Sequence, residues 1–402
     1  MSSLQFMVMK IGKDHKALIC VSLAWFLVLS GRYSISNLLP EIAADLNFSW
    51  TAAGLAMTLM WLIYALVQFP SGILSDIKGR KIIILIAMSI FSFSYVLVGL
   101  SVSFLMFLFA LLLLGFGTGA YPAVGISMIT DIFKKKRGKA LGIRDSAGSL
   151  AYIAPIIAAS IAASYHWRTF FFLWAGICGI SVLIFYKGTT ESTTLPDSVS
   201  IKERIWDGVK VFRSKNVQLV FVVNLLIAIT WISYMSFFTS LLIVEKGFSP
   251  IQAAIALGIL GLGGFIFKPI IGSLSDKYNK KLIIIILSII TALGTLAIVN
   301  IQSLYLIYLI SFIPALATAI FPIISSHLMD SFEEKGRAGK LGFYRSNLIL
   351  LSSPASSVIG FLADKYNFNI PFIGISMILF LAAVILIFNI IFFEKIKKKQ
   401  VA

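Results

Sequence analysis

The sequence predicts an all-α polytopic membrane protein in which twelve transmembrane helices form two pseudo-symmetric six-helix bundles. Of the 402 residues, 59% are hydrophobic and 13% are charged, which is far from the balance of a soluble domain. Apolar runs long enough to span a membrane follow one another along the whole chain. Residues 72–81 also recur, with changes, as residues 272–281. A repeat this long indicates a duplicated domain rather than a short solenoid unit.

The apolar runs predict twelve spans that are separated by short polar or charged loops. The first run follows a basic N-terminal stretch. It is too long for the core of a signal peptide and lacks a small-residue cleavage site, so we expect it to be a span. The expected spans are 17–39, 50–74, 82–101, 104–130, 140–165, 169–187, 217–244, 250–274, 282–300, 303–329, 340–363 and 369–393.

One polar stretch divides the spans into two sets of six. We expect residues 1–187 to form the first bundle, 188–216 a cytoplasmic linker and 217–402 the second bundle. The linker contains an amphipathic run, 201–212, which can lie along the inner membrane surface. Because six spans is an even number, the two halves share one orientation and are related by an axis along the membrane normal.

The net charge of +17 follows membrane topology and does not indicate nucleic-acid binding. Basic residues cluster in the terminal stretches and in every second loop, at 10–16, 78–81, 134–139, 187–215, 277–281, 335–340 and 395–399. This alternation is the positive-inside pattern and predicts a multi-pass protein of the cell membrane with both termini in the cytoplasm. Cys20 and Cys178 lie inside apolar runs, so no disulfide framework is expected.

The repeated loop carries one acidic residue that membrane topology does not explain. Lys78, Arg80 and Lys81 fit the positive-inside pattern, but Asp76 gains nothing from it. At the end of a helix, a carboxylate can face the N-terminal end of another helix or pair with a nearby cation.

With this loop, the chain resembles the major facilitator superfamily over essentially its whole length. Residues 72–81 match the family's pattern G-x-L-x-D-x-x-G-R-K without a gap, whereas the second copy has Asn279 in place of the second glycine. His166, Trp167 and Arg168 form another pattern that is common in this family. The resemblance implies a secondary transporter in which the loop acts as a conformational latch, holding the halves together on the cytoplasmic side in the outward-open state. The expected gating residues are Gly72, Asp76, Gly79, Arg80 and Asp276.

Three cations inside spans are candidates for substrate binding, because a charge within the membrane is costly unless it is paired or hydrated. They are Arg32, Lys268 and Arg345, and no matching set of carboxylates lies within the spans. The substrate can therefore supply the anion. The alternatives are that Arg32 and Lys268 extend to the membrane surfaces, and that Arg345 pairs with Asp145 or a helix end. We expect Asp145 and its neighbour Arg144 to form a structural pair.

Two branches of the family share these cations. Residues 32–42 resemble the first span of the anion:cation symporters, whose arginine contacts the substrate carboxylate, and 268–272 are similar to a basic-Pro-x-x-Gly element of the monocarboxylate porters. Oxalate exchangers likewise carry cations in the eighth and eleventh spans. The acidic proton sites of the symporter branch are missing, since Gly31 precedes Arg32 and residues 117–122 contain no acid. His327 is a candidate proton site, with a hydrogen-bonded helix contact as the alternative.

We therefore expect a secondary transporter of a small organic anion, with a carboxylate as the expected charged group, which works by alternating access as a symporter or exchanger. Its partners are the bilayer, the substrate and protons or a counter-anion, and we expect a monomer that is not an enzyme and needs no cofactor or metal. The alternatives are a drug or lipophilic-compound exporter of the same fold and a non-transporting membrane sensor. The expected substrate-binding residues are Arg32, Tyr33, Tyr64, Tyr121, Lys268 and Arg345.

Overall fold

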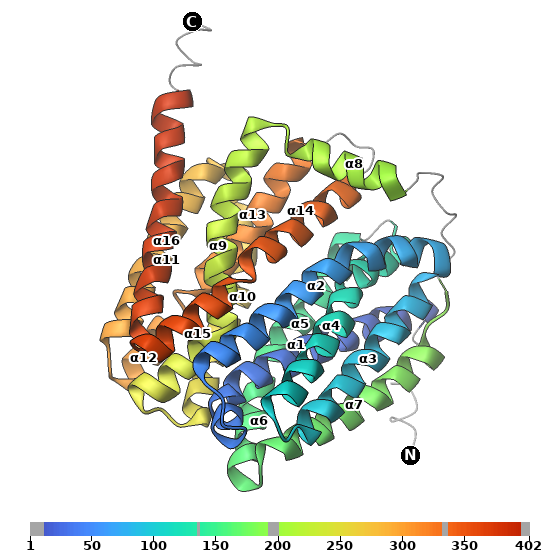
Figure 1. Ribbon diagram of the computed structural model, residues 1–402. Helices are drawn as coiled ribbons and strands as arrows, with labels where there is room; N and C mark the ends of the chain where they lie inside the picture. Colours follow the sequence, from blue (N-terminus) through green and yellow to red (C-terminus); the bar gives the residue numbers. More distant parts are fainter. Residues whose placement is uncertain (1–11, 135–136, 192–200, 332–336, 395–402) are drawn as a thin grey trace, which may run out of the picture.

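The computed structural model describes residues 12–134, 137–191, 201–331 and 337–394. Within these residues, twelve helical segments are long and apolar enough to cross a membrane, which confirms the predicted spans. The segments form two six-helix bundles that lie side by side, the first coloured blue to green and the second yellow to red (Figure 1).

The first bundle uses short polar residues to start its helices. Ser49 accepts a hydrogen bond from the backbone N–H of Ala52, and Ser103 accepts one from Met106, so each caps the helix that follows it. The helices are α1 (Lys13–Asp45), α2 (Trp50–Lys78), α3 (Arg80–Leu100), α4 (Phe104–Ile132), α5 (Arg137–Leu150), α6 (Ala154–Ser164) and α7 (Trp167–Gly188).

A short helix, α8 (Ile201–Val211), precedes the second bundle and forms over the amphipathic run of the linker. Ser249 and Gln252 form a capping box at the start of α10, in which each side chain bonds the other residue's backbone N–H. The helices of the second bundle are α9 (Lys215–Ser240), α10 (Pro250–Lys277), α11 (Lys280–Asn300), α12 (Leu304–Ile310), α13 (Ala315–Ser331), α14 (Arg337–Ser352), α15 (Ala355–Lys365) and α16 (Asn369–Phe388).

Three of the described spans are broken, although the sequence predicted each as one run. A 3-10 turn, Ala151–Ile153, separates α5 from α6 just before Pro155. Residues 311–314 separate α12 from α13, and 353–354 separate α14 from α15. Pro314 and Pro354 lie at these last two breaks, where proline removes a backbone donor and clashes with a continuing helix. The breaks in the fifth and eleventh spans fall at equivalent places in the two halves.

The bundles contact each other mainly at one end. We call the end with the loop between α2 and α3 the basic end, and the other the opposite end. At the opposite end, the Asp364 carboxylate on α15 accepts hydrogen bonds from the backbone N–H groups of Trp50 and Thr51 at 3.0 and 2.7 Å. It also accepts one from the Thr51 hydroxyl at 2.6 Å. The α15 carboxylate therefore caps α2 of the other bundle.

Further contacts extend this closure toward the middle of the protein. The Thr58 hydroxyl donates to the Ser353 carbonyl oxygen at 3.0 Å, across the two bundles. A Cβ atom at Gly54 would collide with the backbone of Ser356, so glycine permits the close approach of α2 to α15. Ser36 donates to the carbonyl oxygen of Ser236, its equivalent 200 positions later, so this bond lies near the pseudo-symmetry axis. The protein is closed at the opposite end.

Candidate functional site

Arg32 lies in the middle of α1 and is almost completely buried, with 3% of its surface exposed. Its guanidinium carbon lies 4.3 Å from the ring centroid of Trp61 and 5.2 Å from that of Tyr64, both on α2. Trp61 and Tyr64 are one helical turn apart, which places them on one face of α2. The Nε and Nη1 atoms of Arg32 have no hydrogen-bond partner among the described residues. The Tyr33 side chain also interacts with the guanidinium. A buried cation beside aromatic ring faces, with two nitrogens that have no partner among the described residues, can accept an anion.

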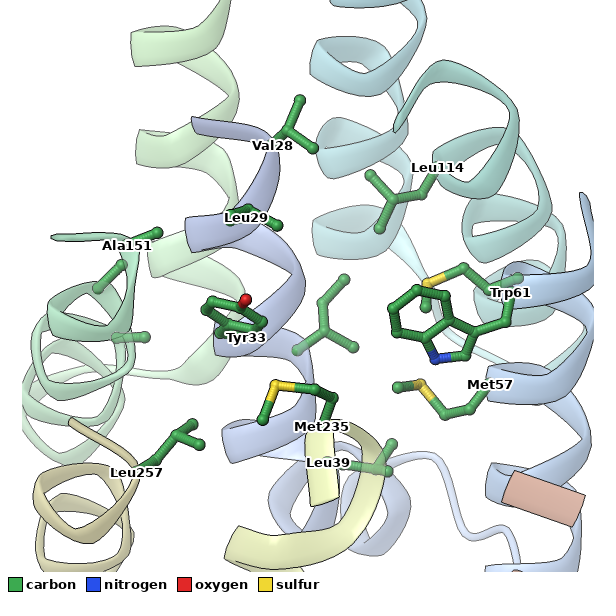
Figure 2. Packing of buried hydrophobic residues seen from close by; sticks show 14 of the residues in the cluster. Val28, Leu29, Tyr33, Leu39, Met57, Trp61, Leu114, Ala151, Met235 and Leu257 are labelled. Carbon is green, nitrogen blue, oxygen red and sulfur yellow. The ribbon is translucent and has the colours of Figure 1, made fainter. Parts of the chain in front are cut away.

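Residues of the second bundle come close to this region, because the ring of Trp61 lies 5.4 Å from that of Trp231 on α9. Figure 2 shows Tyr33 beside Ala151, with Met235 and Leu257 of the second bundle nearby and Trp61 across from them. The Tyr33 ring lies 4.4 Å from that of Tyr152, whose hydroxyl donates to the Met235 sulfur at 3.7 Å. The surroundings of Arg32, which we call the Arg32 chamber, therefore consist of packed, mainly apolar and aromatic side chains where the two halves meet.

Lys268 and Arg345 form a second, hydrated group of charges. Both are surrounded by protein in the middle portions of α10 and α14, yet both side chains are exposed to solvent. The Lys268 ammonium lies near Gly264, one turn toward the opposite end, so this side chain does not extend to the basic end of its helix. Arg345 donates to the Ser325 hydroxyl at 3.1 Å. Within the described part of the chain, neither cation forms an ion pair.

Asp145 lies opposite these two cations. It is within electrostatic range of Lys268 and Arg345, although it belongs to α5 of the first bundle. It also forms an ion pair with Arg144 at 2.9 Å, the local pair that the sequence predicted. The Asp145 side chain is 67% exposed, whereas that of Arg144 is 4% exposed. Asp145 therefore faces water between the bundles.

Five of the six predicted substrate residues lie in the Arg32 chamber or in the exposed charge group of Lys268 and Arg345. Tyr64 connects the two regions, because it lies beside Arg32 and within electrostatic range of Arg345. Tyr33 adjoins Arg32 in the chain, and Lys268 is with Arg345 near Asp145.

Tyr121 is placed elsewhere. It is fully buried in the first bundle, where its hydroxyl donates to the Val21 carbonyl oxygen and its ring stacks on Trp25 with centroids 5.9 Å apart. The Arg144 guanidinium carbon lies 4.0 Å from the ring of Trp25. Tyr121 therefore supports the Arg144–Asp145 pair and is not brought to Arg32.

His327 lies away from both charge groups, in a small crevice of the second bundle lined by α9, α11, α13 and α16. Its Nε2 atom is 3.2 Å from the side-chain amide nitrogen of Asn216, near the start of α9. This contact is of the kind expected as the alternative to a proton site, and the proton role of His327 stays a prediction.

The repeated loop is arranged differently in its two copies. Arg80 is buried and forms ion pairs with Asp76 and with Asp131 of α4, so these bonds stay within the first bundle. Gly79 adopts a φ of 99°, and a Cβ atom there would meet the Glu191 carboxylate. Asn279 instead has a φ of −61° and caps α11 by accepting from the Lys281 N–H at 2.9 Å.

Gly72 and Asp276, the other predicted gating residues, lie at the basic ends of α2 and α10. Gly72 and its counterpart Gly272 each accept a hydrogen bond from a serine three residues later, Ser75 and Ser275, at 2.7 Å. The helix ends are therefore alike up to the point where the loops begin. Among the described residues, no group of three His, Cys, Asp or Glu side chains is placed to hold a metal ion.

The two tryptophans whose rings lie against the buried arginines, Trp61 and Trp25, were not among the predicted substrate residues. Trp61 is one turn before Tyr64 on α2, a spacing that offered a local signal. Trp25 contacts Arg144 across more than 100 residues of chain, and no local pattern indicates this contact.

Comparison with known proteins assigns the family. The sequence profile described as Major Facilitator Superfamily matches residues 21–348 and, in a second match, residues 220–401. The chain belongs to the major facilitator superfamily. This membership agrees with the two six-helix bundles and with the transporter class that the loop motif predicted.

The relatives that the chain resembles are named for different substrates. The chain is 26% identical over 272 residues to a hexuronate transporter of Bacillus subtilis, covering 64% of each chain, so it spans less than two thirds of that relative. It is 28% identical over 153 residues to a probable L-galactonate transporter of Escherichia coli, covering 38% of this chain and 33% of that one. It is also 25% identical over 342 residues to the multidrug resistance protein MdtG of Enterobacter lignolyticus, covering 83% and 81%.

Solved transporter structures share the fold. A point mutant of the nucleoside transporter NupG superposes with a TM-score of 0.80 at 13% identity, covering 94% of this chain and 99% of that one. A bacterial homologue of the human lysosomal transporter Spinster, in an inward-facing and occupied conformation, superposes with a TM-score of 0.74 at 17% identity, covering 94% and 97%. At these identities the likeness concerns the fold alone.

Proposed function

We propose that this protein is a secondary transporter that moves a small organic anion bearing a carboxylate, by alternating access between its two bundles. The basic end faces the cytoplasm, following the positive-inside pattern. The hydrogen bonds that join the bundles within the described residues lie at the opposite end and toward the middle, so we take the basic end as the one that opens and closes. Residues 188–216 link the bundles. The cell membrane is its location, and the working unit is a monomer.

One observation carries this proposal. Arg32 is a buried cation whose Nε and Nη1 atoms lack hydrogen-bond partners among the described residues, and its described neighbours are neutral aromatic side chains, the rings of Trp61 and Tyr64 and the side chain of Tyr33. A buried charge is costly unless an opposite charge compensates for it. A carboxylate can bond a guanidinium in two parallel hydrogen bonds, and the substrate supplies it. The names of the hexuronate and galactonate relatives support an anionic substrate of this size.

Lys268 and Arg345 provide a second cationic region for the rest of the anion. Both are reachable from water and lie in the second bundle, so an anion held by Arg32 and by this pair contacts both halves at once. A ligand that contacts both bundles can couple its own binding to their movement. Counter-anion exchange and symport both fit this arrangement.

The repeated loop is the proposed cytoplasmic latch. Arg80 holds Asp76 at the end of α2, and this places the carboxylate where the second bundle arrives when the basic end closes. In the outward-open state, Asp76 then interacts with a helix end of the second bundle.

Drug export is a second candidate. The match to the multidrug resistance protein covers more of both chains than the hexuronate match does, and aromatic rings line the Arg32 chamber. Against this, a lipophilic cation would be placed beside Arg32, with no carboxylate to receive it among the residues described around that arginine.

A thermal-shift screen of the purified protein separates the two candidates. The anionic probes are D-glucuronate, D-galacturonate and citrate, and the cationic probe is ethidium. A ligand at 100 times its dissociation constant adds about 2.7 kcal/mol to stability. We expect at least one of the anions to raise the melting temperature and ethidium to leave it unchanged. Stabilisation by ethidium alone would favour drug export and contradict the anion proposal.

A further inference from the structure

Asp145 has a geometry that the proposed substrate site does not explain. The carboxylate belongs to α5 of the first bundle, which packs against α10 of the second bundle. Its side chain is largely exposed and lies within electrostatic range of Lys268 on α10 and Arg345 on α14. Asp145 and Arg345 are equivalent positions in the repeat, 200 residues apart, so one position carries opposite charges in the two halves. The charged groups around Asp145 are Arg144 on its own helix, Lys268 on α10 and Arg345 on α14, and Tyr121 of α4 is also in range.

The charges are not balanced without a bound anion. Arg144, Lys268 and Arg345 are three cations around one carboxylate, and water reaches Asp145, Lys268 and Arg345 in this conformation. When the basic end closes, these groups must leave water, and a cation that leaves water without a partner is strongly unfavourable. With substrate bound, the anion neutralises the pair from the second bundle. The empty carrier needs another anion for the same step.

We propose that Asp145 serves as this internal counter-anion, taking the place of the transported anion at Lys268 and Arg345 so that the empty carrier can close its basic end and reorient. This inference deepens the proposed function and rests on it for the identity of the cargo. It assigns Asp145 to net transport and not to substrate binding. A carrier without this carboxylate becomes an obligatory exchanger, because only a bound anion then allows closure.

Asp145→Asn removes the charge and keeps the size, and the new amide oxygen can still accept a hydrogen bond from the buried Arg144. The melting temperature of the variant is measured first, because Arg144 loses its charged partner. Asp145→Glu restores the charge. Asp207→Asn is the matched control, since Asp207 is an exposed carboxylate on α8 that pairs with Lys210, away from the bundle interface.

The first readout compares two modes of transport in proteoliposomes loaded with radiolabelled D-glucuronate. Exchange is measured against external D-glucuronate, and net efflux is measured into anion-free medium. In Asp145→Asn we expect exchange to stay within about threefold of wild type and net efflux to fall about tenfold or more. Asp145→Glu should recover net efflux, and Asp207→Asn should show no change. Equal losses of exchange and efflux, or unchanged efflux, would overturn the inference.

The second readout needs no substrate and therefore stands apart from the proposed function. Fluorophores are attached at Ile77→Cys and Lys277→Cys, exposed equivalent positions at the basic ends of α2 and α10, after Cys20 and Cys178 are replaced by alanine. Energy transfer is measured in anion-free buffer. We expect wild type to populate a closed form with a short distance between the fluorophores. In Asp145→Asn, the population of this closed form should be about tenfold lower. An equal closed population in both proteins overturns the inference, whichever substrate the transporter carries.

Discussion

The two bundles share one fold but treat their charges in opposite ways. The first bundle buries Arg32 and Arg144 against tryptophan rings, whereas the second leaves Lys268 and Arg345 in water. Gly261 is the position of the second bundle that is equivalent to Trp61 in the repeat. Tyr152 of the first bundle packs against this glycine. The two halves therefore share one helical arrangement but differ in their cation sites. The site in the first bundle is aromatic and buried, and the site in the second bundle is exposed to water.

The largest expected effect distinguishes the two copies of the repeated loop. Arg80→Ala removes the buried cation that forms ion pairs with Asp76 and Asp131 in a poorly hydrated place, so it should lower the free energy of unfolding by about 2–3 kcal/mol. The counterpart Lys280 donates to the Ser326 hydroxyl at 3.1 Å in an exposed place. Because exposed charged contacts contribute little, Lys280→Ala should lower the free energy of unfolding by less than about 1 kcal/mol. Both values can be measured by chemical unfolding in detergent. Equal losses would show that the copies are equivalent.

The next effect tests the aromatic side of the comparison. Trp61→Leu keeps an apolar side chain but removes the ring face beneath Arg32, which should weaken binding of the anion by about tenfold, or about 1–2 kcal/mol. The matched control is Trp206→Leu on α8, because Trp206 lies 5.8 Å from the Arg213 guanidinium away from the chamber. Isothermal titration of each variant gives the affinities. Unchanged affinity in Trp61→Leu would remove the ring from the site.

The smallest effect concerns the backbone of the two loops. Gly79 has a φ of 99° and lies against Glu191, so Gly79→Asn should lower the melting temperature by an amount equivalent to about 1–2 kcal/mol. The reciprocal change, Asn279→Gly, removes a helix cap for which glycine is a fair substitute. It should lower the free energy of unfolding by only about 0.3 kcal/mol. The reverse order of the two melting temperatures would mean that the loop conformations are not set by these residues.

Much of the fold could be predicted because it depends on local pattern. Span length, the alternation of basic loops and the repeat indicated two bundles, and the structure confirms them. The breaks before α6, α13 and α15 were not predicted. Hydropathy is continuous across them, and whether a proline kinks or breaks a buried helix depends on the helices packed around it.

The candidate site was only partly predictable for a related reason. A cation in an apolar run is visible in the sequence, so Arg32, Lys268 and Arg345 could be selected before the structure. Their surroundings come from contacts between distant segments. Asp145 faces Arg345 across the bundle interface, and Tyr121 lies beside Trp25, almost 100 residues earlier in the chain.

The central claim is that Arg32 binds the transported anion, and titration calorimetry tests it most directly. The anion that stabilises wild type is titrated into wild type, Arg32→Gln and the control Arg213→Gln, whose arginine is exposed at the end of the linker helix. Loss of a charged hydrogen-bonded contact is worth about 1.5–3 kcal/mol, so we expect Arg32→Gln to bind about 10–100-fold more weakly and Arg213→Gln to bind as wild type does. Wild-type affinity in Arg32→Gln would contradict the account.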